Sequence, residues 1–169
     1  MDNQRSCGSC GLCCKLLAVE AVSKPSHTWC SHFRPGAGCA IYEKRPDECR
    51  TFRCLWLMRP QLDEAWRPNR SHIVLFFADD GKQLIASVDP AYPDAWRKPR
   101  FHDALRDWSR RGFQEGLQVL VRIGQRVVAI LPDREVDLGI VEDHERLKLT
   151  RVRTKDGVAV MARKHAVRS

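Results

Sequence analysis

The sequence predicts an α+β protein in which a small cysteine-rich domain of helices and loops precedes a mainly antiparallel β-sheet with one covering helix. Three observations support this prediction. All eight cysteines lie between Cys7 and Cys54. Short apolar or β-branched runs follow residue 70, and turn sequences separate neighbouring runs. One amphipathic helical pattern lies between the first and the second pair of runs.

Length and composition exclude several classes of protein. The chain has 169 residues, of which 43% are hydrophobic and 30% charged. This composition is too apolar for a disordered chain, and the length suits one domain or one domain with a small satellite. No apolar run approaches the roughly 20 residues that cross a bilayer, and cysteines and a lysine interrupt the region where an export signal would lie. We therefore expect a soluble, cytoplasmic protein with no membrane partner.

Composition changes near residue 60, which predicts two domains. Residues 1–60 hold the cysteines and short loops, whereas residues 61–169 hold the strand-like runs. In the first domain, Leu12, Leu16 and Val19 recur at helical spacing and predict a helix there.

A second short helix, with the turn after it, is expected to carry Cys49 and Cys54. Pro46 suits a first helical turn, where its missing N–H needs no partner. Asp47 and Glu48 then suit the positive end of the helix dipole.

The second domain is expected to consist of hairpins. Its strand-like runs are residues 72–78, 83–88, 117–123, 126–131, 146–152 and 158–163. The turns within the pairs are residues 79–81, 124–125 and 155–157, each of which contains a glycine. Phe101, Leu105 and Trp108 recur on one helical face and predict the covering helix, which Gly112 would cap.

The cysteines favour a metal centre over disulfides. An even count in a secreted chain would predict disulfides, but a reducing compartment makes ligation the better explanation of dense thiols. Two-residue gaps let thiolates turn back onto one ion, and adjacent cysteines suit a disulfide framework poorly. The candidate metal ligands are Cys7, Cys10, Cys13, Cys14, Cys30, Cys39, Cys49 and Cys54.

Glycines and arginines accompany the cysteines. Gly8 and Gly11 each follow a cysteine, where positive φ and close backbone approach are easiest for glycine. Arg50 and Arg53 adjoin cysteines and could offset thiolate charge, although solvent-facing positions explain them equally well. Of the adjacent pair Cys13 and Cys14, we expect one to ligate and the other to pack as a small buried residue.

These motifs carry a resemblance to a known family. CGSCGLCC (7–14), CSHF (30–33) and GCAIYEKRPDECRTFRC (38–54) resemble the CxxCxxCC, or YkgJ-like, cysteine-cluster family. That family is described as a zinc- or iron-chelating domain, and some members are called flagellin lysine methylases. The resemblance covers about the first third of the chain and implies a bound metal without assigning an activity. The positions it implies are Cys7, Cys10, Cys13, Cys14, Cys30, Cys39 and Cys49, with Cys54 and the Arg45-Pro46 pair as companions.

A donor set made almost entirely of cysteine predicts zinc or an iron–sulfur cluster. Each takes four thiolates, so the cysteines could build two sites, or one site with spare structural thiols. We slightly favour iron–sulfur, because three closely spaced thiols and a distant fourth can hold a cluster. His32 could replace a cysteine, although a polar loop position explains it more simply.

We therefore expect a metal-binding protein that holds an iron–sulfur cluster or zinc through its amino-terminal thiolates. The alternatives are a metal-dependent enzyme related to flagellin lysine methylases and a zinc-stabilised module for a protein or nucleic-acid partner. A third alternative function is the storage or delivery of metal. The net charge of +8 does not favour nucleic acid, because the basic residues are scattered among acidic ones.

Overall fold

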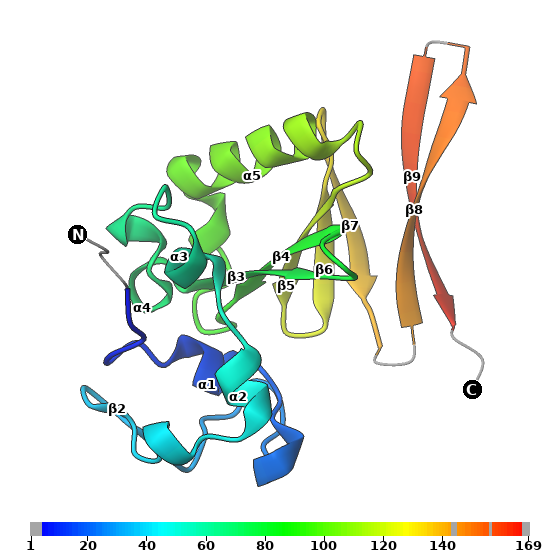
Figure 1. Ribbon diagram of the computed structural model, residues 1–169. Helices are drawn as coiled ribbons and strands as arrows, with labels where there is room; N and C mark the ends of the chain where they lie inside the picture. Colours follow the sequence, from blue (N-terminus) through cyan, green and yellow to red (C-terminus); the bar gives the residue numbers. More distant parts are fainter. Residues whose placement is uncertain (1–4, 143–144, 156, 167–169) are drawn as a thin grey trace. The chain divides into compact units, whose positions relative to one another are not determined.

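The computed structural model describes residues 5–142, 145–155 and 157–166. They form the predicted α+β fold, with mostly antiparallel sheets (Figure 1). Within these residues no helix is both long enough and apolar enough to cross a membrane.

The chain divides into two compact units. The first runs to Phe76 and also includes Ala86–Trp96, and the second comprises Phe77–Ile85 and the residues from Arg97 onwards. The segment after Pro60 contains two short helices and a buried tryptophan, Trp66.

Short elements build the first unit. They are α1 (Leu12–Leu16), η1 (Glu20–Val22), β1 (Phe33–Arg34), β2 (Gly38–Cys39), η2 (Tyr42–Lys44), α2 (Asp47–Thr51), α3 (Leu55–Met58), η3 (Glu64–Trp66) and α4 (Pro68–Ser71). One further turn, η4 (Ala95–Arg97), ends this unit and begins the next. Strands β1 and β2 pair antiparallel.

The first predicted helix is shorter than its apolar pattern suggested. Helix α1 ends at Leu16, because Leu17 is extended and Val19 forms an antiparallel bridge with Lys24. Leu16 and Val19 are nevertheless buried, so the periodicity identified core residues correctly while the chain left the helix early. The second helix is confirmed: Pro46 precedes α2, which carries Cys49.

The strands form one five-stranded sheet and a separate hairpin. The sheet has the order β3 (Ile73–Ala78), β4 (Gln83–Val88), β5 (Gln118–Ile123), β6 (Arg126–Ile130) and β7 (Glu135–Ile140). The hairpin joins β8 (Glu145–Thr154) to β9 (Gly157–Ala166). All the predicted strands are therefore confirmed, although the third turn includes residue 156, which lies outside the described residues.

Strand β7 was not expected from the sequence. Its sequence contains Asp137 and Gly139, which are both disfavoured in strands, and Gly139 has a positive φ of 65°. Pairing with β6 shifts register between Val127 and Val128, which accommodates the irregularity.

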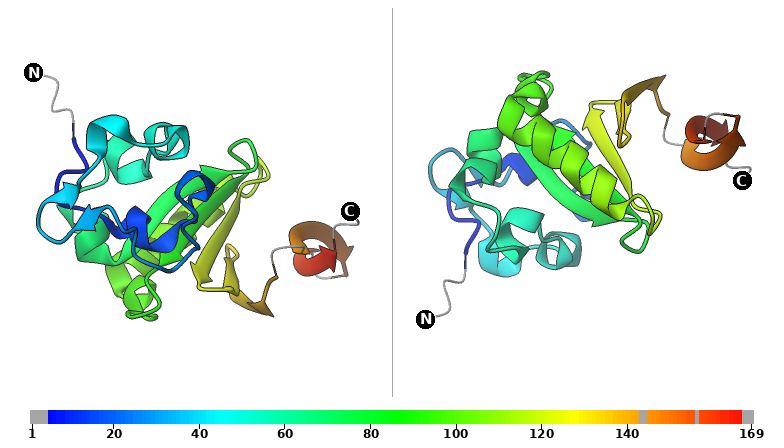
Figure 2. Two further views of the ribbon diagram at one scale, coloured as in Figure 1. Left: turned by 90° about the horizontal axis from the view of Figure 1, so that it is seen from below. Right: turned by 90° about the horizontal axis from the view of Figure 1, so that it is seen from above.

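Helix α5 (Pro99–Gly112) is the predicted covering helix, and it packs on β5 and β6 (Figure 2). Phe101 and Leu105 are buried as predicted, but the third buried position is Ser109, whose hydroxyl donates to the Ile130 carbonyl at 2.7 Å. Trp108 is only half-buried.

The sequence predicted that Gly112 caps this helix, and the structure shows that it does not. It is the last helical residue, and Phe113 follows it at the C-cap in right-handed conformation. A Cβ on Gly112 would overlap the Leu117 side chain, so close packing explains this glycine.

The core of the second unit is formed mainly by residues of its strands and of the segments that follow them. Its buried members are Leu120, Val127, Ala129, Leu131 and Val141. Partly buried Phe113, Val136, Leu138 and Leu147 pack around them, so the unexpected strand contributes to this core.

Candidate metal centre

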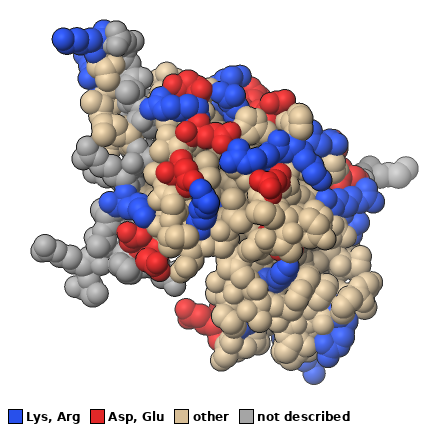
Figure 3. Space-filling view, turned by 180° about the vertical axis from the view of Figure 1, so that it is seen from behind, with Lys and Arg blue, Asp and Glu red and all other residues tan. Residues whose placement is uncertain are grey.

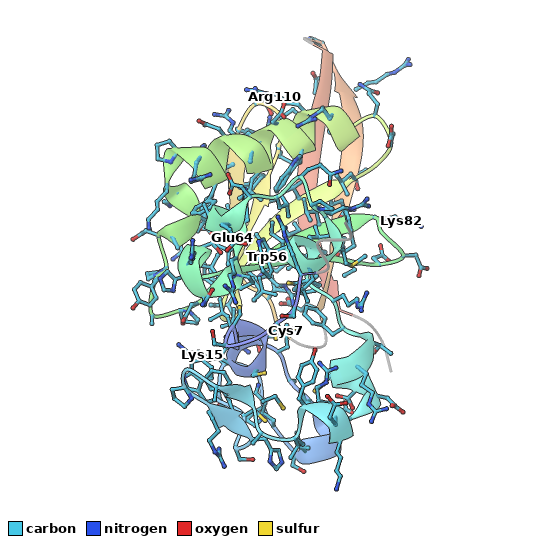
Figure 4. All side chains as sticks on the ribbon, turned by 60° about the vertical axis from the view of Figure 1, so that its left-hand side comes forward. Cys7, Lys15, Trp56, Glu64, Lys82 and Arg110 are labelled. Carbon is cyan, nitrogen blue, oxygen red and sulfur yellow. The ribbon has the colours of Figure 1, made fainter. Side chains whose placement is uncertain are left out.

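Every predicted cysteine ligand lines one cavity of the first unit, which we name the cysteine cavity. It has a volume of about 180 Å³, and its lining includes Cys7, Cys10, Cys13, Cys14, Cys30, Cys39, Cys49 and Cys54. None of these cysteines forms a disulfide. Figure 4 labels Cys7 and shows sulfur atoms in yellow among the short elements of this unit.

Two tight turns position the first four cysteines. The Cys10 N–H donates to the Cys7 carbonyl and the Cys14 N–H to the Gly11 carbonyl, both at 2.8 Å. Gly8 has a φ of 48°, and a Cβ on Gly11 would overlap the Phe33 ring. Both glycines thus have the roles that the sequence predicted for them, one conformational and one steric.

Backbone contacts bring the central cysteines to the same cavity. The Cys30 N–H donates to the Cys14 carbonyl at 3.0 Å. Cys39 pairs with Phe33 across the β1–β2 hairpin. Gly38 lies so close to the Gly8 carbonyl that a Cβ would overlap it, which presses the hairpin against the first cysteine turn.

The last two cysteines lie near helix ends. The Glu48 carboxylate accepts from the N–H groups of Glu20, at 3.0 Å, and Ala21, at 3.3 Å, so it ties α2 to η1. Cys49 is half-buried on α2. Cys54 is buried and precedes α3.

Cys54 and Cys49 interact with different neighbouring thiols. Burial raises the pKa of Cys54, and negative charge on Cys7 and Cys10 raises it further. Burial also raises the pKa of Cys49, but there the neighbouring thiols are Cys14, Cys30 and Cys39.

The adjacent cysteines Cys13 and Cys14 interact through their side chains. A hydrogen bond from the Cys13 thiol lowers the pKa of Cys14 to about 7, although burial opposes this. The same hydrogen bond, with burial, raises the pKa of Cys13 well above its ordinary value. Both residues are half-buried, so the expectation that one packs as a fully buried apolar residue is wrong; Cys54 is the buried cysteine.

Lys24 is a charged residue of the cavity that sequence reasoning missed. Its side chain lines the cavity, and the residue is only 6% exposed. The ammonium donates to the carbonyls of Lys15, at 3.3 Å, Pro25, at 2.9 Å, and Leu17. Burial lowers the pKa of Lys24, while negative charge on Cys30 and Cys14 opposes that shift. Nothing in its local sequence distinguishes this lysine from one in an exposed loop.

A second missed feature anchors the helix that carries Cys13 and Cys14. The Lys15 ammonium donates to both carboxylate oxygens of Asp89, at 2.7 and 2.9 Å. The Asp89 side chain is only 5% exposed and also accepts from the Ala91 N–H. This nearly buried ion pair joins residues 74 positions apart, a separation at which no sequence pattern could pair them.

The tryptophans that border the cysteine segments have different positions. Trp56 is buried and lines the cavity. Trp29 is 48% exposed and stacks on Phe33 at 4.5 Å between ring centroids. His32 lines the cavity together with the cysteines.

The donor set suits a soft metal. Thiolates with one imidazole are the ligands of zinc and of iron–sulfur clusters, whereas harder cations prefer oxygen. Among residues 5–142, 145–155 and 157–166, no three histidine, cysteine, aspartate or glutamate side chains are grouped closely enough to hold an ion as they stand.

Comparisons with protein-family models, curated proteins and solved structures find no match for this chain. The resemblance to the CxxCxxCC family therefore stays a prediction based on the cysteine motifs.

Proposed function

We propose that the first unit binds zinc or an iron–sulfur cluster through the thiolates of the cysteine cavity. The observation that supports this most strongly is the convergence of all eight thiols, none in a disulfide, on one cavity of about 180 Å³. The resemblance to the YkgJ-like family and a cytoplasmic location belong to the same proposal, because free thiols persist in a reducing compartment.

We further propose that the thiols act as two sets of four. We assign Cys7, Cys10, Cys13 and Cys54 to one set, because charge on Cys7 and Cys10 acts on both Cys13 and Cys54. We assign Cys14, Cys30, Cys39 and Cys49 to the other, because charge on the first three acts on Cys49. Cys14 also interacts with Cys7 and Cys13, so the two sets adjoin there. Four thiolates complete either a zinc site or a cubane cluster. The thiols would have to move closer together to bind, as expected where the ion itself assembles its site.

Metal analysis of the full chain purified without oxygen tests this proposal. Iron and acid-labile sulfide in equal amounts, with broad visible absorption, would identify clusters, and about two tightly held zinc ions would identify two tetrathiolate sites. A protein prepared without chelators that contains neither metal, and that takes up neither zinc nor iron with sulfide, would contradict the proposal.

Single substitutions test the division into sets. We expect Cys10→Ser and Cys49→Ser each to lower the metal content by about half, because each removes one ligand from a different set. Ser9→Ala, at an exposed position inside the first motif, is the matched control. Unchanged metal content in Cys10→Ser would exclude Cys10 as a ligand, and complete loss in both variants would indicate one shared centre.

A further inference from the structure

We infer that a second cavity of the first unit binds the phosphate group of a small organic molecule. This cavity has a volume of about 290 Å³, and its lining includes four arginines: Arg5, Arg45, Arg50 and Arg53. We name it the arginine cavity. It shares Cys7, Tyr42 and Arg45 with the cysteine cavity, so a ligand bound there would lie beside the thiols.

Positive charge dominates the lining of the arginine cavity. It contains the guanidinium groups of Arg5, Arg45, Arg50 and Arg53 and no aspartate or glutamate. In the part of the chain that the structure describes, none of these arginines forms an ion pair with a carboxylate. Four like charges at one cavity repel one another, and an anion would relieve that repulsion.

Backbone carbonyls hold two of the arginines in place. Arg5 donates to the carbonyls of Trp56 at 2.7 Å and Arg59 at 3.2 Å. Arg50 donates through Nε to the Arg45 carbonyl at 2.9 Å and through Nη2 to the Glu43 carbonyl at 3.0 Å. These oxygens orient the guanidinium groups without neutralising them, so the positive charge is preorganised for a ligand.

Arg45 has an unsatisfied donor in this region. Its guanidinium lies 3.6 Å from the centre of the Tyr42 ring. Its Nε is buried and has no hydrogen-bond partner. Buried donors are nearly always paired in proteins, so this Nε leaves the Arg45 guanidinium without an acceptor that commits it to another partner in the described structure.

A phosphate group suits this cavity better than a carboxylate does. Guanidinium groups bind both anions through paired hydrogen bonds, but a phosphate monoester carries up to two negative charges and three terminal oxygens. Several arginines can therefore share one phosphate. The cavity lies near the lower end of the range of roughly 300–1,000 Å³ for small-molecule sites, and Tyr42, Phe52 and Leu57 offer apolar surface for an organic group.

Calorimetric titration of the full chain with inorganic phosphate tests this inference, with acetate at equal ionic strength as the carboxylate arm. We expect saturable phosphate binding, weaker acetate binding, and a loss of about tenfold in phosphate affinity in Arg53→Gln. Arg53 suits substitution because no hydrogen bond of its side chain contributes to the described structure. Arg59→Gln removes the same charge at an exposed position outside the cavity and should bind phosphate like wild type.

Three results would overturn the inference: no saturable phosphate binding, equal affinity for acetate, or equal losses in Arg53→Gln and Arg59→Gln. Metal content measured on the same samples separates this inference from the proposed function. Phosphate binding to a protein that neither contains metal nor takes up zinc or iron with sulfide would leave the arginine cavity supported and the metal proposal refuted. Loss of metal in Arg53→Gln with unchanged phosphate affinity would show that Arg53 serves only as a counter-charge for thiolates.

Discussion

At the scale of single residues, Lys24 shows how the cysteine cavity tolerates negative charge. A buried ammonium is costly unless acceptors surround it, and here backbone carbonyls supply them. The same ammonium interacts electrostatically with Cys14 and Cys30. Lys24 therefore links the loop that follows η1 to the thiols that the proposed metal would use.

We predict that Lys24→Met lowers the free energy of unfolding by roughly 3 kcal/mol, because carbonyls that now accept from the ammonium would lose their partner. Denaturant unfolding measures this change. Lys44→Met, at an exposed position of η2, is the control and should shift the midpoint very little. Equal shifts in the two variants would show that Lys24 has no special role in stability.

At the scale of elements, the β1–β2 hairpin depends on a glycine contact with the first cysteine turn. Gly38 has a φ of 91° and lies against the Gly8 carbonyl. Gly36, in the same hairpin, has a similar φ of 77° but open space where a Cβ would lie. Comparing alanine substitutions at the two positions therefore separates the effect of backbone strain from the effect of steric overlap.

We predict that Gly38→Ala destabilises the first unit by about 2 kcal/mol more than Gly36→Ala, because only Gly38→Ala adds a clash to the strain of a positive φ. Since Cys39 follows directly, Gly38→Ala should also reduce the metal content, measured by elemental analysis. Similar stability and metal content in the two variants would refute the steric role of the Gly38–Gly8 contact.

Helix α5 and strand β7 are joined by charged groups. Glu135 accepts from His102 at 2.6 Å and from Arg97 at 3.1 Å. Burial acts to raise the pKa of Glu135, but these hydrogen bonds outweigh it and hold the pKa below its ordinary value. A carboxyl whose pKa is lower in the folded state stabilises the fold above its unfolded pKa. That contribution is lost as the pH falls through the folded value.

We predict that Glu135→Gln lowers the stability by about 1 kcal/mol at pH 7. The difference from wild type should shrink as the pH falls below about 4.5, the ordinary value from which this pKa is lowered. Thermal unfolding at several pH values measures it. The exposed Glu115→Gln is the control, and a difference from wild type that grew in acid would contradict the assigned sign.

At the scale of the whole molecule, the cysteines and the strand-built apolar core lie in different units. All eight cysteines lie in the first unit, and residues 55–169 contain none. The second unit instead has a strand-built apolar core. On the upper part of the face drawn in Figure 3, lysine and arginine side chains lie among aspartate and glutamate, as on an ordinary solvated surface, and the lower part shows few charged side chains.

Local sequence patterns alone were enough to locate most of the strands and the long helix of this protein. Short apolar or β-branched runs and glycine turns predicted six strands, because both are local features of neighbouring residues. Helical periodicity located α5 for the same reason. Strand β7 escaped prediction because its aspartate and glycine obscure the pattern, and its place in the sheet depends on pairing with β6.

The cysteine count and spacing identified every candidate ligand, but only the tertiary structure decided that all of them line one cavity. It alone placed Lys24 among the thiols, joined Lys15 to Asp89 and gathered the arginines beside Cys7. These contacts join residues far apart in the chain, and their partners are chosen by packing and charge in three dimensions. A linear sequence records which side chains are present, and folding determines which of them meet.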